Sequence, residues 1–402
     1  MGMSADHGYR VIGLISGTSI DGIDVAAADL HAEGGTVVLT PLGELDVPYP
    51  EPLREGLLAA LPPNPCGAGE LTRLDTGVGQ AFADAAQRGV AELADGRADL
   101  VASLGQTVFH WVEGGRVRGT LQLGQPAWIA ERTGLPVCAD LRARDVAAGG
   151  HGAPLASTLD HLWLRGLAED TGRPVAALNL GGIANITVVA EGEPVTAYDT
   201  GPANALLDLA AHRVTGERSD VDGRLARSGS VRADLLGRLL ADPYFAAAPP
   251  KSTGKEHFTA GYLDAALAGL DPVEPGDLLA TLTELTAVTV AGACRRHGVT
   301  TVIASGGGVR NPALMAALAR ALPSAVWKTS DDVGLPGDGK EAYLTALLGW
   351  LTWCGVPGTV PSATGARGPR LLGALVPGAG PLILPAPLGG AVTRLRVAEK
   401  AG

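Results

Sequence analysis

The stretch Gly13–Asp24 reads GLISGTSIDGID and follows a short apolar run. Three of its hydroxyl residues can donate hydrogen bonds to phosphate oxygens: Ser16, Thr18 and Ser19. Two glycines let the backbone approach a ligand closely: Gly17 and Gly22. Asp21 and Asp24 would repel phosphate directly, but they can hold Mg²⁺ through water. The stretch therefore fits a phosphate and magnesium site, and it fits an ordinary polar hairpin equally well. Neither the P-loop nor the dinucleotide-binding glycine pattern is present.

Asp199 is a second candidate for chemistry. It lies in AYDTGPANALLDLAAHRVTG, between an expected strand and an expected helix. A carboxylate at a strand end can act as a general base. Asp and Thr are also preferred caps at the start of a helix. Both interpretations of Asp199 stay open at this point.

Further polar residues gather in short segments after expected strands. ADLRARDVAAGGHGAPL holds Arg142 and Arg144, whose guanidinium groups can bind a carboxylate or sugar hydroxyls. A surface ion-pair cluster explains the same arginines equally well. SLGQTVFHW offers Gln106 and Thr107, and GLPGDGKEA places Glu341 at a helix start, where the helix dipole alone favours a carboxylate.

The composition narrows the class of protein. The chain has 402 residues, enough for two or three domains, and 46% of them are hydrophobic. The net charge of −11 disfavours nucleic acid as the main partner. The four cysteines are far apart, which is typical of a reducing cytoplasm, and the histidine spacing does not suggest a zinc site. No signal peptide or membrane helix is expected, because charged residues interrupt the apolar runs.

The elements that must position these residues alternate between strands and helices, which predicts an α/β chain. The expected strands are 10–15, 23–29, 36–44, 100–103, 137–140, 175–180, 186–190, 195–199 and 301–305. The expected helices are 72–93, 126–133, 153–167, 203–215, 260–267, 275–297, 311–322 and 341–355. VIGLISGTSIDGIDVAAADL and VAALNLGGIANITVVAEG share a strand, polar turn and strand. This internal echo suggests either two matching lobes or unrelated hairpins.

Together, ten segments in order resemble the anhydro-N-acetylmuramic acid kinases of bacterial cell-wall recycling. They span about residues 10–375: GLISGTSIDGIDVA, GQTVFH, LQLGQPAWIAERTG, DLRARDVAAGGHGAPL, LNLGGIANIT, YDTGPANALLD, PKSTGKEHF, SGGGVRNP, GLPGDGKEA and SATGARGPRLLGAL. The resemblance implies an actin/hexokinase-like ATPase fold of two lobes with the nucleotide in the interdomain cleft. We expect lobe I at 1–138 and 345–402 and lobe II at 139–344.

The resemblance also implies a reaction and its residues. Water opens a 1,6-anhydro bridge and O6 takes the γ-phosphoryl group of ATP, with Asp199 as the water-activating base. ATP and Mg²⁺ are the implied cofactors, and Asp21 and Asp24 are the expected metal residues. The expected nucleotide-binding residues are Gly17, Thr18, Ser19, Ile20, Asp21, Gly22, Ile23, Asp24, Gly181, Gly182, Asn185, Gly306, Gly307, Gly308 and Asn311. The expected sugar-binding residues are Gln106, Thr107, Arg142, Arg144 and Glu341.

The chain departs from the family pattern at two positions. Leu104 stands where the family usually has His before GQT, and His151 stands where it usually has Gln. These changes leave the identity of the sugar open, and 1,6-anhydroglucose is an alternative substrate. A nucleotide-binding sensor without catalysis on the same fold is a further alternative. The resemblance implies a cytoplasmic homodimer, and no membrane or nucleic-acid partner is expected.

Overall fold

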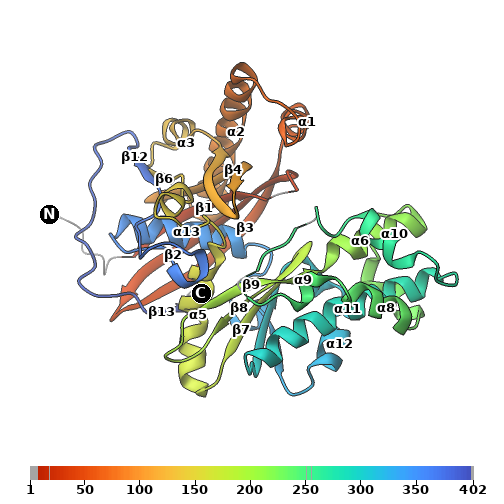
Figure 1. The fold of residues 1–402 in the computed structure, drawn as a ribbon. Coiled ribbons are helices and arrows are strands. Elements are labelled where there is room, and N and C mark those ends of the chain that lie inside the picture. Colours follow the sequence, from red (N-terminus) through yellow and green to blue (C-terminus); the bar gives the residue numbers. More distant parts are fainter. Residues whose placement is uncertain (1–7, 18, 250, 255, 400–402) are drawn as a thin grey trace. The chain divides into compact units, whose positions relative to one another are not determined.

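The computed structural model describes residues 8–399, apart from residues 18, 250 and 255. The chain forms two compact units. The first comprises Met1–Gly166 with Gly334–Gly402, and the second comprises Leu167–Val333 (Figure 1). These boundaries differ from the expected lobes, because residues 139–166 and 334–344 belong to the first unit. The reason is packing: helix α13 (Lys340–Trp353) lies against the strands of the first unit from its start.

The first unit is built on an eight-stranded sheet, with the order β12-β6-β4-β1-β2-β3-β13 and β5 paired to β4. Its strands are β1 (Tyr9–Ser16), β2 (Gly22–Glu33), β3 (Thr36–Pro48), β4 (Leu100–Glu113), β5 (Arg116–Leu123), β6 (Val137–Ala139), β12 (Ala374–Val376) and β13 (Arg394–Val397). Its other helices are α1 (Glu51–Ala60), α2 (Ala68–Arg88), the π-helical η1 (Gly89–Leu93), α3 (Pro126–Thr133), α4 (Ala143–Ala147), α5 (Ala156–Thr171), which runs on into the second unit, and α14 (Pro361–Thr364).

The second unit is built on a five-stranded sheet with the order β11-β10-β7-β8-β9. Its strands are β7 (Val175–Leu180), β8 (Ile183–Val189), β9 (Thr196–Pro202), β10 (Thr301–Ser305) and β11 (Val326–Thr329). Its helices are α6 (Asn204–Thr215), η2 (Val221–Gly223), α7 (Arg224–Ser228), α8 (Ala233–Leu240), α9 (Pro243–Ala246), α10 (Ala260–Leu267), α11 (Pro275–Arg296), η3 (Gly307–Arg310), α12 (Pro312–Ala321) and η4 (Asp331–Val333).

The two sheets share one topology. In each, three consecutive antiparallel strands are followed by two strands that lie parallel to the first: β1, β2, β3, β4 and β6 in the first unit, and β7, β8, β9, β10 and β11 in the second. The echo between the two glycine-bearing hairpins therefore reflects a repeated architecture. The α/β class and its two matching units are confirmed, in agreement with the expected actin/hexokinase-like fold.

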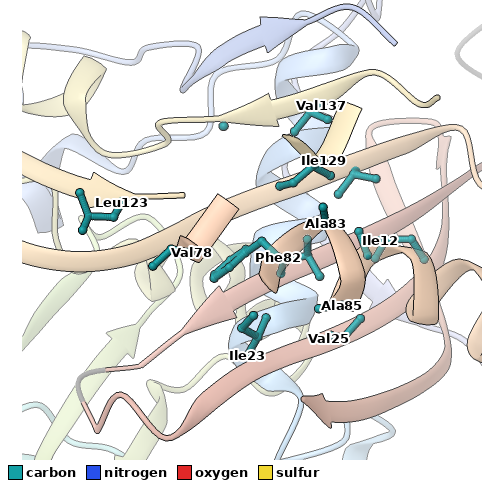
Figure 2. Close-up of a cluster of buried hydrophobic side chains, with 14 of the residues drawn as sticks. Ile12, Ile23, Val25, Val78, Phe82, Ala83, Ala85, Leu123, Ile129 and Val137 are labelled. Atoms are coloured by element: carbon teal, nitrogen blue, oxygen red, sulfur yellow. The ribbon is translucent and has the colours of Figure 1, made fainter. Parts of the chain in front are cut away.

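Alternation along β1 directs its residues to two different layers. Ile12 and Leu14 join the apolar cluster between the sheet and α2, where Phe82 is fully buried (Figure 2). Gly13 faces the opposite way, and a Cβ atom there would lie 2.0 Å from the carbonyl oxygen of Ala342 in α13. Only glycine allows the backbones of β1 and α13 to come so close, and this approach places the start of α13 beside the middle of β1.

Helix α11 is long and apolar enough, by length and composition, to cross a membrane. The sequence led us to expect no such helix. The most apolar stretch of this helix is largely buried within the structure, and the side chains of Leu285 and Val290 are fully buried. Its apolar character is accounted for by the core of the second unit, where it packs against α12 and α6.

Candidate functional site

The turn between β1 and β2 carries the first expected phosphate site. Ile20 adopts φ 53°, a left-handed conformation that a β-branched residue rarely takes. The side chains of Ile20 and Ile23 are buried, so they leave only backbone groups for a ligand. The exposed Ser19 donates its hydroxyl to Asp21 Oδ1 over 2.7 Å. Thr18 lies outside the described residues. Strained backbone of this kind is concentrated at binding sites.

The two glycines of this turn are required for different reasons. A Cβ atom on Gly22 would lie 2.7 Å from the carbonyl oxygen of Val47, so Gly22 permits close packing of β2 against β3. The nearest neighbour of a Cβ on Gly17 would be the Ser19 hydroxyl at 3.8 Å. Gly17 therefore keeps open space beside the turn, as the sequence suggested for both glycines.

Gln106 supports the turn from β4. Its Oε1 accepts a hydrogen bond from the Ser16 hydroxyl over 2.6 Å, and its Nε2 donates to the Gly17 carbonyl over 3.2 Å. The residue is fully buried. Gln106 was expected to contact the sugar, but here its amide holds the end of β1 and the start of the turn. Its neighbour Thr107 is half-buried and accepts from Gln122 Nε2 over 3.2 Å.

A cluster of carboxylates lies at the start of β2, the end of β3 and the start of α13. Asp24 pairs with Asp46 in the antiparallel register of β2 and β3. Burial first, and then the negative charges of Asp46, Glu341 and Asp21, together raise the pKa of Asp24 to about 7. The sequence analysis missed Asp46, because only the strand register brings it to Asp24.

These carboxylates suit a hydrated cation. The accumulated negative charge that raises the Asp24 pKa is the kind that a divalent cation relieves. Among the described residues, no group of three or more His, Cys, Asp or Glu side chains could enclose a metal ion directly. Mg²⁺ keeps most of its water and uses one or two carboxylates, so Asp24 with Asp21 fits this ion.

Arg142 lies on the same side of the first unit as Glu341. Its Nη1 donates to the Gly152 carbonyl over 2.7 Å, and its buried Nε has no hydrogen-bond partner among the described residues. Burial lowers the pKa of Arg142, while the Glu341 carboxylate partly restores it. Arg144 is exposed. The two arginines therefore differ, because Arg142 is half-buried and its buried Nε has a donor to spare.

The glycine loop after Arg142 wraps around a buried carboxylate. Asp145 is fully buried, and its two oxygens accept from Gly152 N and the Thr364 hydroxyl, each over 2.8 Å. A Cβ on Gly150 would lie 2.2 Å from Asp145 Oδ2, so the loop can close only with glycine there. His151, at the tip of this loop, is exposed.

A cavity of about 370 Å³ opens beside the first half of β4 and at the carboxyl end of β6. Its lining includes Leu104 and Asp140, each two positions before an expected sugar residue, together with Asp75 and Gln122. The buried Ser103 hydroxyl, also in the lining, has no partner among the described residues. Carboxyl ends of parallel strands commonly form ligand sites in α/β sheets. Of this lining, the sequence had pointed to Leu104 as a departure from the family pattern, and Asp140 lies in the same segment as Arg142.

Asp199 is the main candidate in the second unit. It belongs to β9, and α6 begins at Asn204 with Ala203 as its cap residue, so Asp199 is not the cap of that helix. Its Oδ2 accepts from the Ser252 hydroxyl over 2.8 Å and from Thr253 N over 2.9 Å. Burial raises its pKa, and these two hydrogen bonds oppose the rise. A carboxylate with a raised pKa is suited to act as a general base near neutral pH.

The loop that holds Asp199 is itself anchored. The Tyr244 hydroxyl donates to the Asp199 carbonyl over 2.6 Å, and Lys251 Nζ donates to the Tyr244 carbonyl over 2.9 Å. By its basic and hydroxyl residues alone, PKSTGKEHF is typical of a solvated loop. Its real function in the fold depends on contacts across more than fifty positions of the chain, which leave no local signal.

The remaining glycine turns lie at the ends of β7 and β10. Gly181 and Gly182 connect β7 to β8, and their carbonyls accept bonds from the start of α6. Asn185 pairs with Asn179 across the hairpin. A Cβ on Gly308 would lie 2.6 Å from the Leu180 Cβ, so this turn packs against the end of β7.

The other residues of the third turn have separate places. Gly306 has φ 84°, a left-handed conformation. Gly307 is exposed. Asn311 is the cap of α12, because its Oδ1 accepts from Ala313 N over 3.0 Å and Leu314 N over 3.2 Å. The structure thus supplies a structural reason for Asn311 and leaves its expected nucleotide contact untested.

Comparison with known proteins gives one matching family and several similar chains. The model of one family, anhydro-N-acetylmuramic acid kinase, matches residues 9–378. The enzyme of that name from Streptomyces coelicolor is 58% identical over 96% of this chain and 99% of its own length. The one from Rhodococcus erythropolis is 52% identical over 92% of this chain and 94% of its own length. Among solved structures, component A of the Acidaminococcus fermentans (R)-2-hydroxyglutaryl-CoA dehydratase is 13% identical, with a TM-score of 0.41 over 85% of this chain and 98% of its own.

Proposed function

We infer the function from one premise: the chain belongs to the anhydro-N-acetylmuramic acid kinase family. The family match over residues 9–378 is the observation that carries the proposal, and it confirms the resemblance seen in the motifs. We propose that the protein consumes ATP, water and 1,6-anhydro-N-acetylmuramic acid. The products are ADP and N-acetylmuramic acid 6-phosphate, formed in cell-wall recycling.

Asp199 is the proposed base. The oxygen of a water molecule forms a bond to the anomeric carbon, and the bond from that carbon to O6 breaks. O6 forms a bond to the γ-phosphorus of ATP, while the bond from that phosphorus to the β–γ bridging oxygen breaks and ADP leaves with that oxygen. One proton of the water passes to the Asp199 carboxylate. Because phosphoryl transfer neutralises O6, a separate acid for the leaving oxygen is not needed, in contrast to most glycoside hydrolases. The bonds from Ser252 and Thr253 to Oδ2 support this role, since they hold the carboxylate in place.

The β1–β2 turn is the proposed phosphate site. Gly17 keeps space beside the turn, and the exposed Ser19 can donate to a phosphate oxygen. Asp24 and Asp21 would hold Mg²⁺ through water. When bound, this ion offsets the negative charge of the phosphates. The turns at Gly181–Gly182 and Gly306–Gly308 are the proposed second phosphate loop and nucleoside contact, with Asn185 and Asn311 beside them.

The cavity lined by Leu104 is the proposed sugar pocket. Its apolar lining suits the carbon skeleton of a bridged sugar, while Asp75, Gln122 and Ser103 offer polar partners for hydroxyl or acetamido groups. Arg142 is the proposed partner of an anionic or hydroxyl substituent, because its buried guanidinium retains an unused donor. Glu341 would act beside it, with Thr107 and Arg144 at the edge of the pocket.

Sugar-dependent ADP formation tests the proposal. Purified protein is mixed with Mg·ATP and either 1,6-anhydro-N-acetylmuramic acid or 1,6-anhydroglucose, in water enriched in ¹⁸O. We expect ADP with the first sugar and one ¹⁸O atom at its anomeric carbon. Faster turnover of 1,6-anhydroglucose would change the assigned substrate. ATP binding with no ADP formation from either sugar would favour a non-catalytic nucleotide-binding protein.

Location and assembly are part of the same proposal. We propose a homodimer of the cytoplasm, on the basis of the family and of the scattered cysteines, all four of which are free. The net charge of −11 supports small-molecule substrates and disfavours nucleic acid as a partner. Size measurement by light scattering tests the dimer.

A further inference from the structure

Helix α13 begins with a buried ion pair that the proposed chemistry does not use. Lys340, the first residue of the helix, is 9% exposed, and its Nζ lies 2.7 Å from Oδ1 of Asp160 in α5. Asp160 is 4% exposed. The Trp163 ring covers the ammonium group at 5.7 Å from its centroid. All three side chains belong to the first unit.

The position of Lys340 is unfavourable by two general rules. Backbone dipoles place partial positive charge at a helix start, so a lysine there is repelled while a carboxylate is favoured. Moving an ammonium and a carboxylate out of water also costs free energy that their attraction barely offsets. Apolar residues of similar size commonly give a fold as much stability as a buried ion pair does. The pair between Lys340 and Asp160 therefore calls for a role other than stability.

The composition of α13 indicates that role. The helix reads KEAYLTALLGWLTW, and every residue except Glu341 is buried. A helix that is apolar all round gains similar burial in several rotations and axial shifts, so apolar contacts define its register weakly. A single buried polar pair removes that freedom, as a polar residue does in a coiled-coil core. The Tyr343 hydroxyl, which donates to the Gly43 carbonyl over 3.1 Å, adds a second anchor one turn later.

The residue that follows the anchor is the exposed Glu341. Its charge raises the pKa of both Asp24 and Arg142, so it lies near the proposed metal carboxylate and the proposed sugar-binding arginine. Successive residues of a helix point about 100° apart. Lys340 can therefore be held against α5 while Glu341 faces the site. A rotation of the helix about its axis, or a shift along that axis, would displace Glu341 directly.

We propose that Lys340 and Asp160 are positioning residues that set the register of α13 and thereby place Glu341. This inference rests on the proposed function, in which Glu341 acts at the sugar. The pair is expected to contribute little to the free energy of unfolding and much to turnover. That combination separates it from a purely structural contact.

A double-mutant cycle tests the proposal in the full-length enzyme. Lys340→Met with Asp160→Leu replaces the pair by apolar side chains of similar size. We expect thermal unfolding within a few degrees of wild type and a kcat for ADP formation at least about tenfold lower. In a Glu341→Gln background, the same exchange should change kcat by less than about threefold, because the positioned group is already lost. If the double variant does not fold, Asp160→Asn, which keeps the side-chain shape, is used in the same cycle.

The control is an ion pair at the far end of β1. Arg10→Met with Asp29→Leu removes a contact of 2.8 Å between Arg10 Nε and Asp29 Oδ1, and kcat should stay within about twofold of wild type. An equal fall of kcat in both Glu341 backgrounds, or no fall at all, would overturn the positioning role. Wild-type protein that forms no ADP with the sugar would instead refute the proposed function itself.

Discussion

Ser252 donates its hydroxyl to Oδ2 of Asp199 over 2.8 Å, and the backbone N–H of the next residue reaches the same oxygen. Both bonds go to one carboxylate oxygen, and among the described residues Oδ1 has no recorded donor. The two bonds favour the ionised carboxylate, whereas burial favours the neutral form. The balance leaves a carboxylate with a raised pKa, as the proposed base requires.

Asp199→Asn is expected to lower kcat for ADP formation by about 10²- to 10⁴-fold, the usual contribution of a general base. Asn is isosteric and can still accept through its carbonyl, so thermal unfolding and ATP binding should be nearly unchanged. Steady-state kinetics and calorimetric ATP titration measure both effects. A variant that retained most of its turnover would remove Asp199 from the mechanism.

Ser252→Ala is expected to raise the pKa of Asp199 further, because one bond to the charged form is lost. A base must be deprotonated to act, so the acidic limb of the profile of kcat against pH should move to higher pH. The profile of the variant is compared with that of Ser228→Ala, whose hydroxyl donates to the Leu225 carbonyl in α7. The control profile should match wild type, and an unshifted limb in Ser252→Ala would contradict the assigned contact.

Stabilisation by Mg²⁺ is expected to grow with pH. The Asp24 pKa is about 7 in the folded chain and near 4 in the unfolded chain, so the folded state binds this proton more tightly. Proton binding by Asp24 therefore stabilises the folded chain fully below about pH 4, and this stabilisation is lost as the pH rises through 7. Mg²⁺ competes with that proton. Thermal unfolding with and without Mg²⁺ should therefore differ more at pH 8 than at pH 5.5.

Asp24→Asn provides the matched comparison for this pH effect. The amide cannot ionise, so the growth of Mg²⁺ stabilisation between pH 5.5 and 8 should largely disappear. The variant should also turn over Mg·ATP less efficiently than wild type. If stabilisation by Mg²⁺ grew equally with pH in the variant, the metal would bind elsewhere.

Gly22→Ala should affect the stability of the fold, whereas Gly17→Ala should affect the binding of ATP. The new methyl group on Gly22 would meet the Val47 carbonyl at 2.7 Å, and the overpacking should lower the free energy of unfolding by about 1–3 kcal/mol. The methyl group on Gly17 has open space and should leave stability nearly unchanged while raising KM for ATP. Chemical denaturation and ATP kinetics distinguish the two. Equal destabilisation by both changes would disagree with this packing.

Leu104→Phe should reduce the volume of the cavity beside β4 and β6. We expect KM for 1,6-anhydro-N-acetylmuramic acid to rise by about tenfold, roughly the cost of one poor fit in a pocket, with KM for ATP unchanged. The smaller 1,6-anhydroglucose should be affected less. If KM for both sugars stayed the same, the sugar would bind outside this cavity.

Much of the secondary structure was predictable from local pattern. Every expected strand and helix core is present, and 126–133 and 260–267 match α3 and α10 residue for residue. The extension of β4 to Glu113 and its hairpin with β5 were missed, although TVFHWVE is rich in residues that favour strands. Its apolar residues come in adjacent pairs and do not alternate one by one with polar ones, so the two-residue period of a strand is hidden. The short β12 and β13 were missed for a related reason, since only pairing with distant strands makes them strands.

The order of elements, the repeated hairpin and the identity of the family follow from the sequence alone, because they depend on residue types and on spacing between near neighbours. Tertiary structure alone decided which groups meet. It placed Asp46 beside Asp24, buried Gln106 under the turn and joined Lys340 to Asp160. Proton affinity and hydrogen-bond partners depend on burial and on residues far away in the chain, and neither is encoded in any short stretch of sequence.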